Sequence, residues 1–160
     1  MTRSYKTISI ALAIGLAVFL QVLFVFADTQ STPNRSAAEF VKAYFAYDEA
    51  GMMDRICAES MVVDDVNLVK QYVYEEARKA DARGFGLGIY TRWKVAHLET
   101  ETLESGHGTA SVRLTCQIRQ PMRSFFVGEE ISEHVEAVLD LVKEDGRWKV
   151  CGNPFRLGEV

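Results

Sequence analysis

The spacing of apolar residues changes after Gly86, and this change limits the fold more than any other feature of the sequence. Between residues 36 and 83, apolar side chains recur every three or four positions, which indicates helices. Beyond Gly86 they alternate with polar side chains, which indicates strands. The clearest alternation runs over residues 109–119, where one face carries Val112, Leu114, Cys116 and Ile118. Helices followed by strands predict an α+β domain.

Four strands are predicted in the second half of the chain. They cover residues 87–103, 109–119 and 135–141, with a last strand after the tight-turn signal Asp145-Gly146. Residues 121–130 form a long connection between the second and third strands. The alternation favours a curved antiparallel meander with one apolar face toward the helices. The sequence thus predicts two to three helices packed on a four-stranded sheet. One further short strand is expected at residues 61–63.

The helical part contains three segments with recognisable starts. Ser36 and Glu39 form a capping-box pattern that predicts the start of the first helix, and Gly51 is the expected stop. Asp48 falls on the apolar stripe of this helix. A short helix is expected over residues 52–58. Asp64 or Asp65 is the expected cap of a long helix, whose apolar stripe is Val66, Val69, Val73, Ala77 and Ala80.

An uncharged apolar segment, residues 8–26, follows Arg3 and Lys6 at the start of the chain. As a helix it would be about 28 Å long, close to the hydrocarbon thickness of a bilayer. Residues 25–27 also fit a signal-peptidase site, so residues 1–27 are predicted to be a signal peptide or a signal anchor. In both cases the rest of the chain is exported, and residues 8–26 hold it at the membrane if they are not cleaved. Residues 28–35 are the expected linker.

The charge of the chain excludes one class of partner. Its net charge is −4 at pH 7, and the excess of acids is larger beyond residue 27, because no acid precedes that point. A net acidic domain is a poor partner for the phosphate backbone, so nucleic-acid binding is not expected. We expect an extracytoplasmic protein, on the periplasmic or cell-surface side, that is either anchored in the inner membrane or secreted.

The order of elements resembles the nuclear transport factor 2-like superfamily. The resemblance rests on the opening helix around residues 40–45, on Gly51-Met-Met-Asp54, on the long third helix and on the closing segment Glu144-Asp-Gly-Arg-Trp-Lys-Val150. It covers residues 36–155, so residues 36–160 are taken as one domain. The resemblance implies a cone-shaped α+β fold and frequent dimers through the sheet. The superfamily includes small enzymes such as ketosteroid isomerase and scytalone dehydratase, and many domains without catalysis.

A pocket between helices and sheet would be lined by a small set of aromatic and ionisable residues. His97 is expected to point inward, because Arg92 and Lys94 mark the outward face of its strand. Asp48 is an acid on a core-facing stripe. These two, with Tyr44 and Tyr47, are the candidates for acid–base catalysis. A strand-end histidine and a helix-end aspartate are the favoured explanations of His97 and Asp48. The expected ligand-pocket residues are Tyr44, Tyr47, Trp93, His97 and Trp148.

Three cysteines lie beyond the apolar segment, so at least one thiol is unpaired within the chain. Strand parity places Cys116 on the inner face and Cys151 on the outer face, which favours a disulfide between Cys57 and Cys151. The chain has no metal-ligand spacing and no glycine-rich phosphate loop at a helix start, so no metal and no cofactor are expected.

The segment 121–128 carries Met122, Phe125 and Phe126 in a connection where polar residues are usual. Such a segment can cap a pocket, or contact a partner or a membrane surface, or simply cover its own core. Together these features favour a non-catalytic binding domain for a small apolar ligand or a protein partner. The alternatives are a small pocket enzyme of the isomerase or dehydratase type and a structural dimerisation module of an envelope complex.

Overall fold

The computed structural model describes residues 12–21, 31–88 and 90–157, which fall into two compact units, Met1–Ser31 and Thr32–Val160. In the first unit, residues 12–21 form a helix with exposed side chains. None of the described helices is both long and apolar enough to cross a bilayer. The remaining parts of the apolar segment, residues 8–11 and 22–26, lie outside the described residues, as do residues 28–30 of the predicted linker.

The first helix of the second unit, α2 (Pro33–Ala46), begins four residues before the predicted start, because its N-cap is Thr32 and the predicted N-cap is Ser36. Its N-cap is Thr32, whose side-chain oxygen accepts a hydrogen bond from the Arg35 backbone N–H. Ser36 is buried inside the helix, so the predicted capping box is wrong. Proline at the first helical position fixes φ near its helical value and needs no hydrogen-bond partner, which explains why the helix starts at Pro33.

The first helix also ends earlier than its apolar stripe suggests. Tyr47 adopts a left-handed conformation (φ 55°) and ends α2, and Asp48 is the N-cap of the next helix, α3 (Glu49–Arg55). The predictions of Asp48 on the stripe and of Gly51 as a helix stop are therefore wrong. Gly51 lies inside α3, where an added Cβ would be 2.6 Å from Asp48 Oδ2 and 3.0 Å from the Ala43 Cβ. Glycine is needed there for close packing.

A small hairpin separates the short helix α4 (Ala58–Met61) from the long helix α5 (Leu68–Ala82). Its strands β1 (Val62–Val63) and β2 (Val66–Asn67) pair with each other and not with the main sheet. Asp64 and Asp65 form the turn, both with positive φ, and are not caps. Asn67 caps α5 instead, because its Oδ1 accepts the Lys70 N–H at 3.0 Å.

The main sheet has the four strands expected from the sequence, in the order β3-β4-β5-β6, with every neighbouring pair antiparallel. The strands are β3 (Lys94–Ser105), β4 (Thr109–Arg119), β5 (Ser132–Glu144) and β6 (Arg147–Cys151). The predicted α+β fold class is confirmed. The first strand starts later than predicted, and the connection between β4 and β5 contains the short helix α6 (Pro121–Val127).

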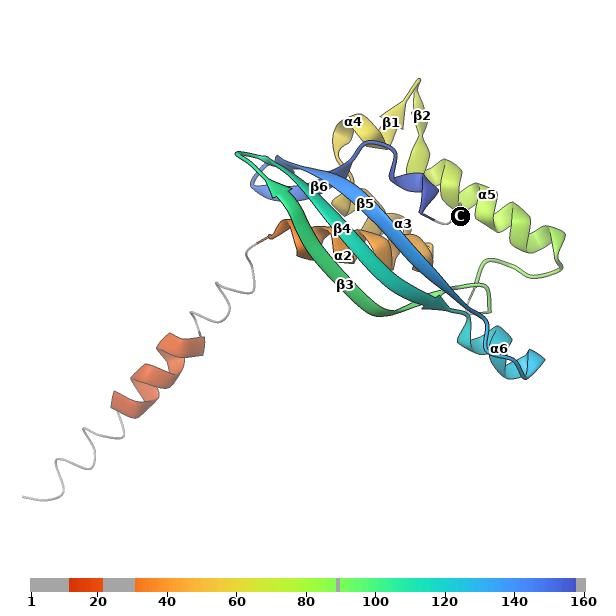
Figure 1. The fold of residues 1–160 in the computed structure, drawn as a ribbon, viewed down its shortest axis with the longest axis horizontal. Helices are drawn as coiled ribbons and strands as arrows, with labels where there is room; N and C mark the ends of the chain where they lie inside the picture. Colours follow the sequence, from red (N-terminus) through yellow and green to blue (C-terminus); the bar gives the residue numbers. More distant parts are fainter. Residues whose placement is uncertain (1–11, 22–30, 89, 158–160) are drawn as a thin grey trace, which may run out of the picture. The chain divides into compact units, whose positions relative to one another are not determined.

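The two faces of the sheet differ in chemistry, and α2 lies against the apolar one (Figure 1). The outer face is polar: Arg113 pairs with Glu101 and Glu136, and Ser111 donates a hydrogen bond to Asp140. Buried side chains of the inner face meet those of α2. The strand residues in this core are Val112, Leu114, Cys116, Ile118, Val135, Leu139, Leu141, Trp148 and Val150.

The cap at Asp48 is tested by two substitutions. Asp48→Ala removes the oxygen that accepts the Gly51 N–H at 3.2 Å, so we expect a loss of about 1 kcal/mol in the free energy of unfolding. Asp48→Asn keeps an acceptor and should change this free energy by a few tenths of a kcal/mol at most. Urea unfolding followed by tryptophan fluorescence measures both. Equal losses in the two variants would contradict a capping role and point to the charge.

Candidate binding site

Four aromatic rings from separate segments meet beside α2, and we call Tyr44, Tyr47, Tyr72 and Phe155 the ring cluster. Tyr44 of α2 stacks on Tyr72 of α5, with centroids 4.4 Å apart and planes at 15°. Phe155 belongs to the 3₁₀ turn η1 (Pro154–Arg156). The ring centroid of Tyr72 lies 5.7 Å from that of Phe155 and 6.1 Å from that of Tyr47. Ring pairs at such distances attract one another beyond their burial. The cluster therefore joins α2, α5 and the end of the chain.

The hydroxyl groups at the centre of the ring cluster bond to the chain itself. Tyr44 Oη donates a hydrogen bond to the Phe155 carbonyl oxygen, and Tyr72 Oη donates one to the Tyr44 carbonyl oxygen, both at 3.4 Å. Burial and the neighbouring Tyr44 raise the pKa of Tyr72. Tyr72 is thus a neutral phenol at physiological pH, and its role in the cluster is to pack and to donate a hydrogen bond.

Tyr47 stands at the polar edge of the cluster. Burial and the negative charge of Glu76 raise the pKa of Tyr47 to about 12, while a hydrogen bond from Trp93 acts in the opposite direction. Glu76 also pairs with Lys79 at 2.6 Å. The backbone N–H of Trp93 bonds to the Phe45 carbonyl oxygen, which fixes the start of β3 against the end of α2. This edge offers a neutral phenol, an indole N–H and a carboxylate to a bound group.

The structure brings together three of the five residues predicted to line a pocket, namely Tyr44, Tyr47 and Trp93. Trp148 is buried in the core on β6. His97 is exposed, so its predicted inward direction is wrong. The strand pairing shifts register between Ala96 and Glu99, and His97 adopts a φ of 49° there. Such a bulge reverses the alternation of side chains on which the prediction relied.

Two members of the site, Tyr72 and Glu76, were missed by the sequence analysis. Both lie on the same face of α5 as Val69, at spacings of three and seven residues, so the helical period could have found them. Asp48 is exposed at the start of α3, as described above. The other two histidines, His107 and His134, are also exposed.

The cysteines form one cross-link. Cys57 and Cys151 are joined by a disulfide with their Cα atoms 5.4 Å apart, across a sequence separation of 94 residues. The pairing is the one favoured by strand parity. Cys116 is a buried free thiol, and burial raises its pKa. The disulfide ties the helical half of the unit to the last strand of the sheet.

A shallow groove of about 440 Å³ lies on α2 and α3, away from the predicted pocket. Its walls carry Glu39, Lys42, Asp54 and Arg55. Arg55 pairs with Glu39 at 2.6 Å and with Asp54 at 3.2 Å, so its charge is already compensated. The groove is a charged surface and does not resemble an apolar ligand pocket.

The helix α6 joins β4 to β5 at one end of the sheet (Figure 1). A second group of aromatic side chains faces solvent there. We call Tyr90, Phe125 and Phe126 the aromatic surface. Their exposed fractions are 48%, 79% and 68%. The ring of Phe126 lies 5.9 Å from that of Tyr90 and 5.5 Å from that of Phe125. The apolar segment noted in the sequence therefore exposes its rings and does not cover the core with them.

Nine chains of solved structures are similar to this chain, and two of them are described here. One is a candidate ketosteroid isomerase from Shewanella frigidimarina NCIMB 400, with 16% identity, coverage of 74% of this chain and 89% of that chain, and a TM-score of 0.46. The other is a candidate calcium/calmodulin-dependent protein kinase II association domain from Xanthomonas campestris, with 11% identity, coverage of 72% and 81%, and a TM-score of 0.41. No protein-family model and no curated protein sequence matches this chain.

The class of fold follows from the elements themselves. An amphipathic helix, a short helix and a long helix precede a four-stranded antiparallel sheet, and α2 packs on one face of that sheet. The elements follow the α+β order that the resemblance to the nuclear transport factor 2-like superfamily implies. Because this fold carries both enzymes and non-catalytic domains, the function has to be argued from the site.

Two tyrosines on α5 test the ring cluster. Tyr72→Ala removes the ring that stacks on Tyr44, and we expect the free energy of unfolding to fall by roughly 2–3 kcal/mol, less than for a fully buried aromatic residue. Tyr74→Ala is the control, because its side chain is 64% exposed and its removal should cost about 0.5 kcal/mol or less. Urea unfolding measures both. Similar losses for the two variants would show that the cluster does not hold α5.

Proposed function

We propose that this chain is an exported, non-catalytic binding domain that contacts a protein partner through the aromatic surface. The observation that carries the proposal is the exposure of three neighbouring rings at one end of the sheet, where Phe126 lies next to both Tyr90 and Phe125. Aromatic side chains are enriched at protein interfaces and often dominate their binding energy. Water is a poor environment for such rings, so a partner that covers them gains free energy.

Export is supported by the sequence and by the cysteines. Residues 8–26 are uncharged and follow Arg3 and Lys6, the pattern of a signal peptide or signal anchor. The disulfide between Cys57 and Cys151 suits an oxidising compartment, because cytosolic thiols are kept reduced. We therefore place the domain on the extracytoplasmic side, secreted or held at the membrane by residues 8–26.

Binding at the surface is favoured over binding of a ligand inside the domain, because the rings of the ring cluster fill the space of the expected pocket. Tyr44, Tyr72 and Phe155 pack on one another where the sequence predicts the pocket. Their two central hydroxyls are bonded to backbone carbonyl oxygens. A small apolar ligand would have to displace these contacts, whereas a partner at the aromatic surface displaces only water.

The alternative of a pocket enzyme has lost two of its expected acid–base groups. His97 is exposed at a bulge, and Asp48 uses its carboxylate to cap α3. Tyr44 and Tyr47 remain, but the Tyr44 hydroxyl is bonded to the Phe155 carbonyl oxygen, and the pKa of Tyr47 is raised to about 12, so Tyr47 is a weak acid. A general acid or base works best when its pKa is near the operating pH. The site therefore supports binding better than catalysis.

The aromatic surface is tested by photo-crosslinking in the full chain. A benzophenone amino acid at position 126 should give a discrete protein adduct on irradiation of the cells that produce the chain. The same amino acid at position 74 is the matched control, because Tyr74 is also an exposed aromatic residue. A partner adduct from position 126 and none from position 74 is the expected result.

The adduct's mass separates the kinds of partner. A mass of twice the chain would indicate a second copy, and any other mass a different protein. Equal adduct patterns from both positions, or lipid adducts alone at position 126, would contradict the proposal. So would a purified chain whose native mass spectrum shows a bound small molecule that Tyr72→Ala releases.

Export is tested on the mature protein. We expect it in the membrane or extracytoplasmic fraction, with its amino terminus at residue 1 or 2 if anchored, or near residue 28 if cleaved. Without reductant, an alkylating mass tag should modify one cysteine per unfolded chain, and after reduction three, because Cys57 and Cys151 are paired. A soluble cytoplasmic protein with three reactive thiols before reduction would exclude export.

A further inference from the structure

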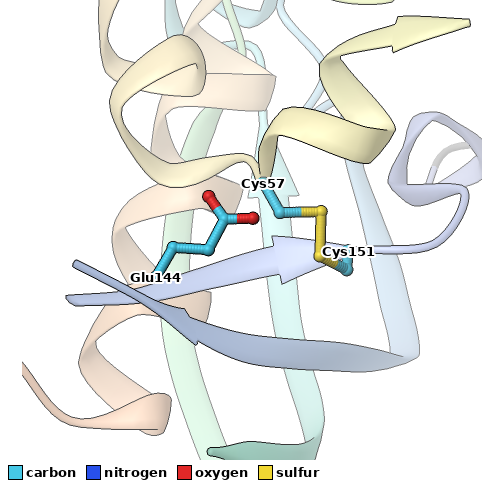
Figure 2. A group of neighbouring side chains, drawn as sticks. All are labelled: Cys57, Glu144 and Cys151. Atoms are coloured by element: carbon cyan, nitrogen blue, oxygen red, sulfur yellow. A yellow bond between two sulfur atoms is a disulfide. The ribbon is translucent and has the colours of Figure 1, made fainter. Parts of the chain in front are cut away.

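Two cysteine sulfur atoms and one carboxylate lie together at the edge of the sheet (Figure 2). The ligand atoms of Cys57, Glu144 and Cys151 all lie within 4.8 Å of one another. Across the residues that the structure describes, this is the one group of three cysteine, histidine or acidic side chains so placed. Cys57 precedes α4, Glu144 ends β5 and Cys151 ends β6. The fold thus assembles a compact set of metal-ligand atoms from three segments.

The chemistry of these atoms depends on the oxidation state of the sulfur pair. In the disulfide the sulfur atoms are bonded to each other and carry no charge. After reduction by two electrons and uptake of two protons they are thiols, which bind a metal ion as thiolates. Two thiolates and one carboxylate suit Zn²⁺, which takes sulfur, nitrogen and oxygen ligands in a tetrahedron. A water molecule would supply the fourth ligand.

The backbone keeps the two cysteines together without the disulfide. The Cys57 N–H donates a hydrogen bond to the Val150 carbonyl oxygen at 2.9 Å, and Ile56 forms a parallel bridge with Val150. Val150 is fully buried and precedes Cys151 directly. Reduction removes the bond between the sulfur atoms but leaves this bridge. The dithiol form should therefore hold both thiols close to Glu144.

The neighbours of Glu144 hold its carboxylate in place, and one of them, Lys149, carries a positive charge that affects cation binding. Its Oε1 accepts a hydrogen bond from the Ala58 N–H at 3.4 Å, and its Oε2 pairs with Lys149 at 3.2 Å. Ser60 Oγ lies 3.3 Å from Cys57 Sγ. The Lys149 ammonium repels a cation, so a bound ion competes with Lys149 for the carboxylate. Cys151 and Glu144 are half-buried, which gives an ion access.

We propose that the dithiol form of this chain binds one Zn²⁺ through Cys57, Cys151 and Glu144, so that the same cysteines form a zinc site before they form the disulfide. Binding releases the two thiol protons as the zinc–sulfur bonds form. Oxidation by a disulfide-containing oxidant moves two electrons from the sulfur pair to the oxidant, forms the sulfur–sulfur bond and releases Zn²⁺. Both forms link α4 to the end of β6. Zinc would hold this link before the disulfide has formed.

The proposal is tested by measuring the Zn²⁺ affinity of the full chain in detergent, in competition with a chelator. The chain is reduced with a phosphine, desalted without oxygen and titrated with Zn²⁺ against a chromogenic chelator. We expect one Zn²⁺ per chain, bound at least tenfold more tightly by the reduced form than by the oxidised form. The oxidised form is an internal control for Cys116, because this thiol is free in both. Circular dichroism checks that the reduced chain remains folded.

Variants that retain both cysteines distinguish a zinc ligand from a residue that only stabilises the fold. Glu144→Gln should weaken Zn²⁺ binding by about tenfold or more, while Glu136→Gln, an exposed acid on the same strand, should leave it unchanged. Lys149→Met should tighten binding, because it removes the competing cation. A residue that only stabilised the fold would not give opposite effects at Glu144 and Lys149.

Three results would overturn the proposal. The first is equal Zn²⁺ affinity of the reduced and oxidised chains. The second is equal affinity of the Glu144→Gln and Glu136→Gln variants. The third is a reduced chain that is unfolded and does not regain its circular dichroism spectrum when Zn²⁺ is added. In addition, Cd²⁺ should produce a thiolate charge-transfer band in the reduced chain and none in the oxidised one.

Discussion

The packing of α2 on the inner face of the sheet is the contact on which the rest of the second unit depends. Phe40 and Val41 are fully buried, and α2 contacts all four strands of the main sheet. Each such side chain stabilises the fold by roughly 1.5–3 kcal/mol relative to an exposed one. The exposed ion pairs of the outer face, such as Arg113 with Glu101, contribute about 0–1 kcal/mol each. Apolar burial therefore decides the architecture, and the exposed ion pairs add little to its stability.

The segments farther from this core are held by fewer and more specific contacts. The ring cluster attaches α5 and the chain end to α2, and the disulfide with its backbone bridge attaches α4 to β6. A cross-link over about 100 residues contributes roughly 4–5 kcal/mol in the chain-entropy account. In α5 the buried residues are Val69 and Ala80, and α6 exposes Phe125 and Phe126 of the aromatic surface. A packed core that carries exposed segments at its periphery suits a binding domain.

The sequence predicted part of the site because the alternation of side chains along a strand and the spacing of apolar residues along a helix are local properties. Tyr44 lies on the apolar stripe of α2, and the cysteine pairing followed from strand parity. Prediction failed where local geometry broke the period. The bulge at His97 turned an expected inward side chain outward, and the left-handed Tyr47 made Asp48 a cap. No periodic pattern contains such breaks, because they depend on how neighbouring strands and helices fit together.

By itself, the sequence determined the fold class, the four-stranded meander and the inner face of β4, because these depend on alternation between neighbouring residues. It also determined the sharp start of the domain, although the cap is Thr32 and not Ser36. Only the tertiary structure decided that Tyr72 and Phe155 fill the expected pocket, and that Glu144 approaches the cysteine pair. These contacts join residues far apart in the chain, and their distances are set by three-dimensional packing, which no local pattern encodes.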